Sequence, residues 1–395
     1  MSNDVNPLGE KLLAVSRGKD FALYRIEGKY CPELRKYVIS TPWTRDVLNN
    51  PEIVGHKFTE SLKRAVIMSM ANFPEPEVME GVTDLTCNVF HFLRGGLNFG
   101  IPDALYHALG FNMVSSSFMT SQRDKDPEGR WFIKDDQYQK FTFTKDATIF
   151  CGDIVATGST IDNGLKRLFK LAKNSGKPIK NLIFFTVGCH KIEKILAKYH
   201  DMFKTHFKGY GNTFIFYVEG KFHLADSHTD LHIKLQGTDL LRQPALIAPE
   251  FELSQYDSVS APLERCVIYD GGTRKFDAAE YFDDVIHYWV AVRQLAKHGW
   301  TLGRAYLERW PETEYQLPYR EFCAYKEKYW EGVPDSFMQK LYQARQNRWS
   351  GRFAKQAESS DALLHLAEER LAVLSPDGIP FPAARPVVKL DPGDE

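Results

Sequence analysis

The sequence predicts an α/β fold: a parallel sheet with helices on both faces, followed by a mixed, mainly helical C-terminal region. Between residues 81 and 225, short apolar segments alternate with amphipathic segments at the spacing of βαβ units. The amphipathic segments repeat apolar residues at intervals of three and four, as a helix packed on a sheet requires. In such sheets, ligands bind beyond the carboxyl ends of the strands.

The expected core elements follow in chain order. Strands are predicted at Thr86–Leu93, Phe111–Met119, Ala147–Cys151, Asn181–Val187 and Thr213–Glu219. Helices are predicted before Gly110, after the loop that ends at Thr160, and over Lys191–Phe203.

The regions outside this core define the expected domain organisation. Residues 1–80 are predicted to be a helical N-terminal extension, with its best helix at His56–Ala71. Residues 226–350 form an accessory C-terminal region with helices over 283–298 and 336–349, and residues 351–395 a further helix and a Pro-rich mobile tail. The predicted domains are therefore 1–80, 81–225, 226–350 and 351–395.

Composition excludes several classes of protein. The 395 residues are 43% hydrophobic and carry a net charge of −1, so no global basic field indicates a nucleic-acid partner. No apolar run reaches the length of a membrane span, and the N-terminus does not resemble a signal peptide. The six cysteines form no CxxC pair, which favours free thiols in a reducing cytoplasm. We therefore expect a cytoplasmic enzyme with small-molecule substrates, no membrane and no nucleic acid.

The most informative motif is the strand, loop and helix that begin at Ala147. The loop Ala156-Thr157-Gly158-Ser159-Thr160 lies at a helix N-terminus, where unpaired N–H groups and the helix dipole favour an anion. Gly158 permits backbone geometry that a side chain forbids, and the hydroxyls add donors. Asp153, at the strand end, is better suited to sugar hydroxyls or to a metal. Cys151 beside it is expected to be a buried packing residue rather than a nucleophile.

Other interpretations of this motif fit less well. A Walker A loop needs a Lys after the glycine, and a dinucleotide fingerprint needs three glycines at fixed spacing; neither is present. The remaining alternative is an ordinary strand, loop and helix without a ligand.

A second glycine-containing loop follows the first predicted core strand. Arg94-Gly95-Gly96 allows a sharp turn and close approach to a ligand, and Arg94 offers a planar, permanently charged group to phosphate oxygens. On its own, this loop is better explained as a turn with a solvated arginine.

These two loops, in this order, resemble the phosphoribosyl-pyrophosphate (PRPP) motif and the pyrophosphate loop of type I phosphoribosyltransferases. In that family, two acidic residues hold the ribose hydroxyls and a Thr-Gly-x-Thr loop cradles the 5′-phosphate. Here Asp153 matches the second acidic position, Gly152 stands at the first, and Thr157 to Thr160 match the loop.

The resemblance implies roles for particular residues. Residues 156–160 would bind the 5′-phosphate, Arg94, Gly95 and Gly96 the pyrophosphate, and Asp153 the ribose and, indirectly, Mg²⁺. The implied reaction transfers the phosphoribosyl group of PRPP to a nitrogen acceptor, most simply a nucleobase, in a homodimeric enzyme of nucleotide metabolism. The alternative is a non-catalytic regulatory protein of the same fold that senses PRPP.

A charged insert lies between the two loops. Residues 121–137 are polar and long, which is typical of a lid or of a solvated β-hairpin. Arg123-Asp124 followed by Pro127-Glu128 is faintly similar to the loop of uracil phosphoribosyltransferases. Arg123 is therefore predicted to reach the reacting centre from this lid.

Two polar clusters follow the core. His223, Asp226, His228, Asp230 and His232 alternate as metal ligands can, but no partner motif supports a metal, so an exposed polar loop is expected. The turn that contains Asp270 and Arg274 is either a hairpin turn or a ligand loop. These two residues are the candidates for contact with the base.

Overall fold

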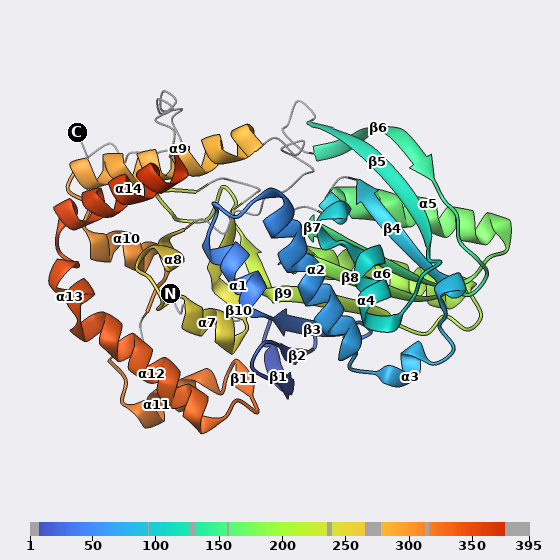
Figure 1. Cartoon of the computed structure of the whole chain (residues 1–395), viewed down its shortest axis with the longest axis horizontal. Coiled ribbons are helices and arrows are strands. Elements are labelled where there is room, and N and C mark those ends of the chain that lie inside the picture. The colour runs from blue at the N-terminus through green and yellow to red at the C-terminus, as the bar shows by residue number, and fades with distance from the viewer. Residues whose placement is uncertain are drawn as a thin grey trace.

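The computed structural model describes residues 8–93, 95–125, 131–155, 158–234, 239–264, 278–312 and 316–375, with the backbone alone for 121–125, 131–137, 244 and 278–280. The described residues contain one sheet of eleven strands with helices around it (Figure 1). The strand order is β11-β1-β2-β3-β9-β8-β7-β4-β5-β6, and β10 pairs with β9.

The centre of the sheet is parallel, as predicted. The order β5-β4-β7-β8-β9-β3 contains only parallel pairs. Strand β8 is buried along nearly its whole length, which is typical of a central strand covered on both faces. The central strands are β3 (Arg35–Ser40), β4 (Cys87–Leu93), β5 (Ser115–Lys125), β7 (Ala147–Val155), β8 (Ile179–Cys189) and β9 (Thr213–Leu224).

The two faces of the sheet are covered by different helices. Because successive side chains of a strand point to opposite faces, Cys151 and Gly152 mark the two faces of β7. Helix α5 (Ser159–Ser175) covers one face, where Gly164 packs on Phe92 and Phe90. Helix α6 (Lys191–His206) lies beside it.

The other face is covered by the segments that precede and follow β4. The covering segments are α2 (Gly55–Ala71), η2 (Gly95–Phe99) and α4 (Ile101–Leu109), and the short helices α3 (Pro76–Met79) and η1 (Asp84–Thr86) connect α2 to β4. Helix α2 presents Phe58, Leu62 and Val66 to the core at helical spacing. The helix predicted at His56–Ala71 is thus confirmed.

The prediction of a helical N-terminal extension is wrong for residues 11–40. These residues form β1 (Lys11–Arg17), β2 (Ala22–Glu27) and β3, which extend the central sheet, and only then follow α1 (Pro42–Asn49) and α2. The three strands lack the clear alternation of apolar and polar residues that would predict a strand. In β3 the reason is that distant parts of the chain bury it on both sides.

The C-terminal region is mainly helical, as predicted, but two of its strands join the same sheet. Strand β10 pairs with the end of β9, and β11 pairs with β1. Figure 1 shows the helices, in yellow to red, gathered beside the core. The elements are β10 (Leu240–Ile247), α7 (Pro249–Ser254), α8 (Ser260–Leu263), α9 (Ala278–Lys297), α10 (Leu302–Arg309), α11 (Tyr319–Lys326), β11 (Trp330–Glu331), α12 (Asp335–Ser350), α13 (Arg352–Gln356) and α14 (Ser360–Leu374). Among the described residues, no helix is long and apolar enough to cross a membrane.

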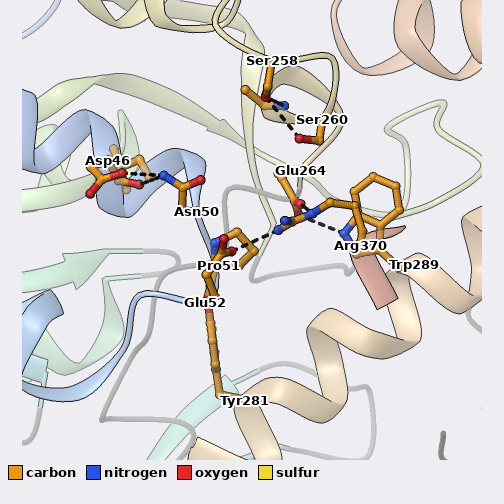
Figure 2. A network of polar contacts seen from close by, with 12 residues as sticks. Asp46, Asn50, Pro51, Glu52, Ser258, Ser260, Glu264, Tyr281, Trp289 and Arg370 are labelled. Carbon is orange, nitrogen blue, oxygen red and sulfur yellow. Dashed lines mark hydrogen bonds and ion pairs between the residues drawn. The ribbon is translucent and has the colours of Figure 1, made fainter. Parts of the chain in front are cut away.

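A polar network attaches the C-terminal helices to the loop between α1 and α2 (Figure 2). Arg370 of α14 donates to Glu264 at 2.5 Å and to Glu52 at 3.0 Å, and the indole of Trp289 donates to Glu264 at 3.0 Å. Tyr281 of α9 donates to the carbonyl of Pro51 at 2.8 Å. Residues far apart in sequence therefore hold these helices to the N-terminal part of the chain.

A buried group of four charges attaches the N-terminal strands to α6. The ammonium of Lys36 contacts Glu10 at 2.5 Å and Glu193 at 3.0 Å, and the ammonium of Lys221 contacts the same two carboxylates. All four side chains are at most 5% exposed. Tyr217 donates a further hydrogen bond to Glu193 at 2.9 Å. We call Glu10, Lys36, Glu193 and Lys221 the buried charge tetrad.

A second buried carboxylate, Glu219, lies where β9 bends. Its φ of 61° is in the left-handed region, and its Oε1 accepts hydrogen bonds from the N–H of Thr41 at 2.9 Å and from the hydroxyl of Thr44. Burial raises the pKa of Glu219 to about 7, and the charge of Arg45 opposes that shift.

We expect Glu219 to make stability depend on pH. With its pKa raised, the folded state binds the proton more tightly than the unfolded state, so its contribution is present at low pH and is lost as pH rises from about 4.5 to about 7. Urea unfolding of Glu219→Gln should remove this dependence, so the stability of the wild type relative to the variant should fall by about 2–3 kcal/mol across that interval. A constant difference between the two proteins would contradict the shift.

Candidate ligand site at the carboxyl ends of strands β4 and β7

The direction in which strands are added to the sheet reverses between β4 and β7. From β4 the chain moves outward to β5, and it later returns to the other side of β4 to form β7, β8 and β9. This reversal of strand order is where open α/β sheets bind ligands. Both loops singled out in the sequence begin here, after Leu93 and after Val155.

Gly96 and Gly152 bring the turn after β4 into direct contact with strand β7. A Cβ on Gly96 would lie 2.8 Å from the carbonyl oxygen of Gly152, and a Cβ on Gly152 would lie 2.8 Å from the ring of Phe99. Phe99 is fully buried and belongs to η2, which begins at Gly95. Residue 152 is therefore glycine because the ring of Phe99 fills the space of any larger side chain.

We expect Gly152→Asp to destabilise the protein rather than to restore an acidic pair. The new side chain would overlap Phe99 and would also press on the carbonyl of Phe185, 3.2 Å from its Cβ. Overpacking of a filled core costs typically about 1–3 kcal/mol, and a buried carboxylate adds to that cost. Urea unfolding measures this loss, and an unchanged unfolding midpoint would show that Phe99 yields easily.

Gly158 shapes the N-terminus of α5. Its φ of 78° is left-handed, and a Cβ there would lie 2.4 Å from Cδ1 of Ile195 on α6. Gly158 provides no side-chain cap for the helix, so the first-turn N–H groups are not satisfied by the N-cap residue. Ser159 and Thr160 are half-buried at this helix start. The backbone is thus arranged to receive an anion.

Asp153 lies at the same edge, on the β7 strand. Its side chain is half-buried, and its Oδ1 accepts the N–H of Ile154 at 2.9 Å. Cys151, two residues earlier, is fully buried, and burial together with the charge of Asp153 raises the pKa of its thiol. Cys151 is therefore a packing residue, as expected, because its thiolate is strongly disfavoured.

The structure adds two polar side chains that the sequence analysis missed. Asn98 in η2 is fully buried, and neither atom of its amide has a hydrogen-bond partner among the described residues. His91 in β4 stacks on Phe118, with 4.8 Å between the ring centroids. Burial lowers the pKa of His91 to about 4, so its imidazole is neutral. The sequence does contain a signal for them. Each is a polar residue within an apolar run, His91 before Arg94 and Asn98 after it.

Several predicted site residues lie outside the described residues. These are Arg94, Ala156, Thr157, Asp270 and Arg274. Arg123 is described by its backbone alone, which lies in β5 opposite Ile133 of β6 (Trp131–Lys140). The segment 121–137 was expected to be either a lid or a β-hairpin. Its described parts, before residue 126 and after residue 130, pair as antiparallel strands β5 and β6, as the hairpin alternative predicted. Closure of this hairpin over the site stays a prediction.

Of the histidine and aspartate cluster, His223 lies in β9, and the other four residues lie in the polar segment after it, as expected for a loop beside a strand end. Asp226 Oδ1 accepts the N–H groups of His228 at 2.9 Å and Thr229 at 3.1 Å, and His232 contacts Glu308 at 3.3 Å. No group of three metal-binding side chains occurs in the part of the chain that the structure describes.

Mg²⁺ fits the site only as a metal carried by the ligand. At the described carboxyl edge of β7, the protein offers the carboxylate of Asp153, while Phe99 excludes a second one at residue 152. One carboxylate together with substrate phosphates is a usual coordination for Mg²⁺.

Comparisons with known proteins reach only part of the chain. No family model matches it, and no curated protein is similar to it in sequence. The chain is similar to the solved structure of a hypothetical protein from Neisseria gonorrhoeae with bound ppGpp, at 12% identity over 33% of this chain and 67% of that one, with a TM-score of 0.22.

Two further similar structures are phosphoribosyltransferases. The hypoxanthine-guanine phosphoribosyltransferase from Bacillus anthracis, with HEPES in its active site, is 23% identical over 33% of this chain and 67% of that one, with a TM-score of 0.22. The hypoxanthine phosphoribosyltransferase from Staphylococcus aureus is 16% identical over 31% and 62%, with a TM-score of 0.21. These TM-scores are too low to assign a function to the chain.

Proposed function

We propose that this protein is a phosphoribosyltransferase-like enzyme that transfers the phosphoribosyl group of PRPP to a nitrogen acceptor, most simply a nucleobase, and releases pyrophosphate. The observation that carries the proposal is the placement of the PRPP-like motif. Asp153 lies at the reversal of strand order and follows Gly152, whose carbonyl oxygen is in contact with the Gly95-Gly96 turn, and the Gly158 cap of α5 follows the end of the same strand. A sugar phosphate held there would meet an anion-binding helix start and a carboxylate together.

In this proposal, the chain mainly positions the reactants. The N–H groups and hydroxyls of residues 158–160 bind the 5′-phosphate, and Asp153 accepts hydrogen bonds from the ribose hydroxyls. The bond from C1 to pyrophosphate breaks as the acceptor nitrogen bonds to C1. Arg94 and the Gly95-Gly96 turn stabilise the charge of the departing pyrophosphate, and Arg123 adds charge from the β5–β6 hairpin. Mg²⁺, when bound with the phosphates near Asp153, offsets part of their charge.

Asp153→Asn tests the ribose contact. Because hydrogen bonds to a charged group contribute about 1.5–3 kcal/mol, PRPP affinity should fall at least about tenfold. Calorimetry with PRPP and Mg²⁺ measures the loss. The matched control is Asp162→Asn, which removes a carboxylate from the first turn of α5 that is ion-paired with Lys198 at 2.8 Å. The control should keep its affinity for PRPP, and equal affinities in all three proteins would reject the assignment.

A non-catalytic PRPP-sensing protein of the same fold is the second candidate. The packing of Phe99 against Gly152 favours it, since this packing leaves Asp153 without an acidic neighbour at residue 152. A pyrophosphate-release screen with PRPP and a panel of bases and amines separates the two functions. Release with at least one acceptor supports the enzyme, whereas PRPP binding without release with any acceptor supports the sensor.

A further inference from the structure

The outer surfaces of α5 and α6 carry a concentration of positive charge that the net charge of the chain conceals. Residues 159–208 contain eleven Lys and Arg residues but three Asp and Glu residues, whereas the whole chain has a net charge of −1. One of the three carboxylates, Glu193, is buried in the charge tetrad and faces away from this surface.

The basic side chains form one continuous surface. Helix α5 exposes Lys166, Arg167, Lys170 and Lys173, and α6 exposes Lys191, Lys194, Lys198 and Lys204. The two helices lie side by side, since Tyr199 of α6 donates to the carbonyl of Asp162 at 2.8 Å and Lys198 pairs with the same residue. Both helices follow parallel strands and so run in the same direction. We call these eight side chains the α5–α6 basic surface.

The α5–α6 basic surface is too long for all of its charges to act on a ligand at the proposed 5′-phosphate loop, residues 156–160. Ser159 and Lys173 are separated by about 21 Å along the helix axis, at 1.5 Å per residue. The Debye length at physiological ionic strength is about 8 Å, so the distal lysines contribute little field at the loop. A ligand that uses all of these charges must extend along both helices.

The chemistry of the surface favours the backbone of a nucleic-acid duplex. Leu171 is the single large apolar side chain of the described helices α5 and α6 that is strongly exposed, at 40%, so the surface has no apolar stripe to enter a membrane. The aromatic side chains Phe169, Tyr199 and Phe203 are buried and offer no stacking platform for unpaired bases. A duplex presents about one negative charge per 1.7 Å, hence about 15 over the length of α5.

We propose that the α5–α6 basic surface binds double-stranded nucleic acid through its phosphate backbone, without sequence preference. It departs from the expectation of no nucleic-acid partner, which depended on net charge. The proposal is independent of the phosphoribosyltransferase-like function.

The test is fluorescence anisotropy with a duplex of about 24 base pairs, between about 50 and about 200 mM KCl. The distal variant carries Lys166→Glu, Lys170→Glu, Lys173→Glu and Lys204→Glu, all exposed members of the α5–α6 basic surface that lie outside the 5′-phosphate loop, residues 156–160. Its affinity at the lower salt should fall at least about tenfold. The slope of log K against log salt should decrease by about 0.9 for each phosphate that the variant no longer neutralises.

The matched control has the same change of charge elsewhere. It carries Lys297→Glu, Lys328→Glu, Lys340→Glu and Lys355→Glu, all exposed in the C-terminal region. Its affinity for the duplex should fall less than about threefold, because only the change in net charge affects it. Circular dichroism confirms folding of both variants, and unchanged PRPP calorimetry of the distal variant separates this result from the proposed function.

Three outcomes would overturn the proposal. They are absence of duplex binding by the wild type at the lower salt, equal losses in the distal and control variants, and preference for phosphatidylserine vesicles over the duplex. The last outcome would assign the surface to membranes.

Discussion

Gly158→Val is expected to reduce PRPP affinity by at least about a hundredfold. A valine at φ 78° is strained whatever the space around it, and its Cβ would lie 2.4 Å from Cδ1 of Ile195, the terminal atom of a side chain that can turn aside. We therefore expect the backbone at residue 158 to leave its left-handed conformation and to shift the loop. Movement of the loop misdirects the first-turn N–H groups of α5. Loss of two hydrogen bonds to a charged phosphate, at about 1.5–3 kcal/mol each, gives the expected factor. Calorimetry with PRPP and Mg²⁺ measures it.

The other end of the same helix provides the control. Gly176, the C-cap of α5, has a φ of 63°, and a Cβ there would have no atom within 4 Å. Gly176→Val therefore imposes similar backbone strain at a site remote from the loop. It should lower stability yet keep PRPP affinity. If both variants bind PRPP as the wild type does, the anion site is not at the start of α5.

Lys36→Met is expected to destabilise the protein by about 3–5 kcal/mol. The change leaves the carboxylates of Glu10 and Glu193 with one ammonium group, that of Lys221, in a region where all four side chains are at most 5% exposed. Breaking a buried ion pair has this cost because it leaves a charge without compensation. Urea unfolding monitored by circular dichroism measures the change.

Two further variants test whether the loss of stability in Lys36→Met comes from the unbalanced buried charge. Lys36→Met combined with Glu10→Gln restores a balanced interior and should regain part of the lost stability. Lys11→Met breaks an exposed pair with Glu331, whose side chains are 36% and 56% exposed, and should cost less than about 1 kcal/mol. A loss with Lys36→Met no larger than with Lys11→Met would contradict a structural role of the tetrad.

Helix α6 contributes residues both to the buried charge tetrad and to the basic surface, from opposite sides of the helix. Glu193 is turned inward to Lys36 and Lys221, whereas Lys194 and Lys198 are exposed. Consequently, the exposed surface of α6 is more basic than its sequence. Net charge alone concealed this surface because acidic residues elsewhere in the chain offset its lysines.

Local sequence patterns were sufficient for the parallel core. The apolar runs around Val89, Phe150 and Phe184 predicted β4, β7 and β8 because strands buried on both faces are almost continuously apolar. Both glycine loops were found in the same way, since a strand end followed by small residues is a local signal. Their meeting at one edge of the sheet followed from the predicted parallel order.

The tertiary structure alone decided the features that depend on distant residues. Strands β1 to β3 looked helical in isolation because their burial comes from pairing with β9 and β11 and not from their own alternation. Residue 152 is glycine for a reason that lies far earlier in the chain, in the ring of Phe99. Likewise, the tetrad joins residues 10, 36, 193 and 221. Local propensity carries no information on such pairs, since only folding brings their side chains together.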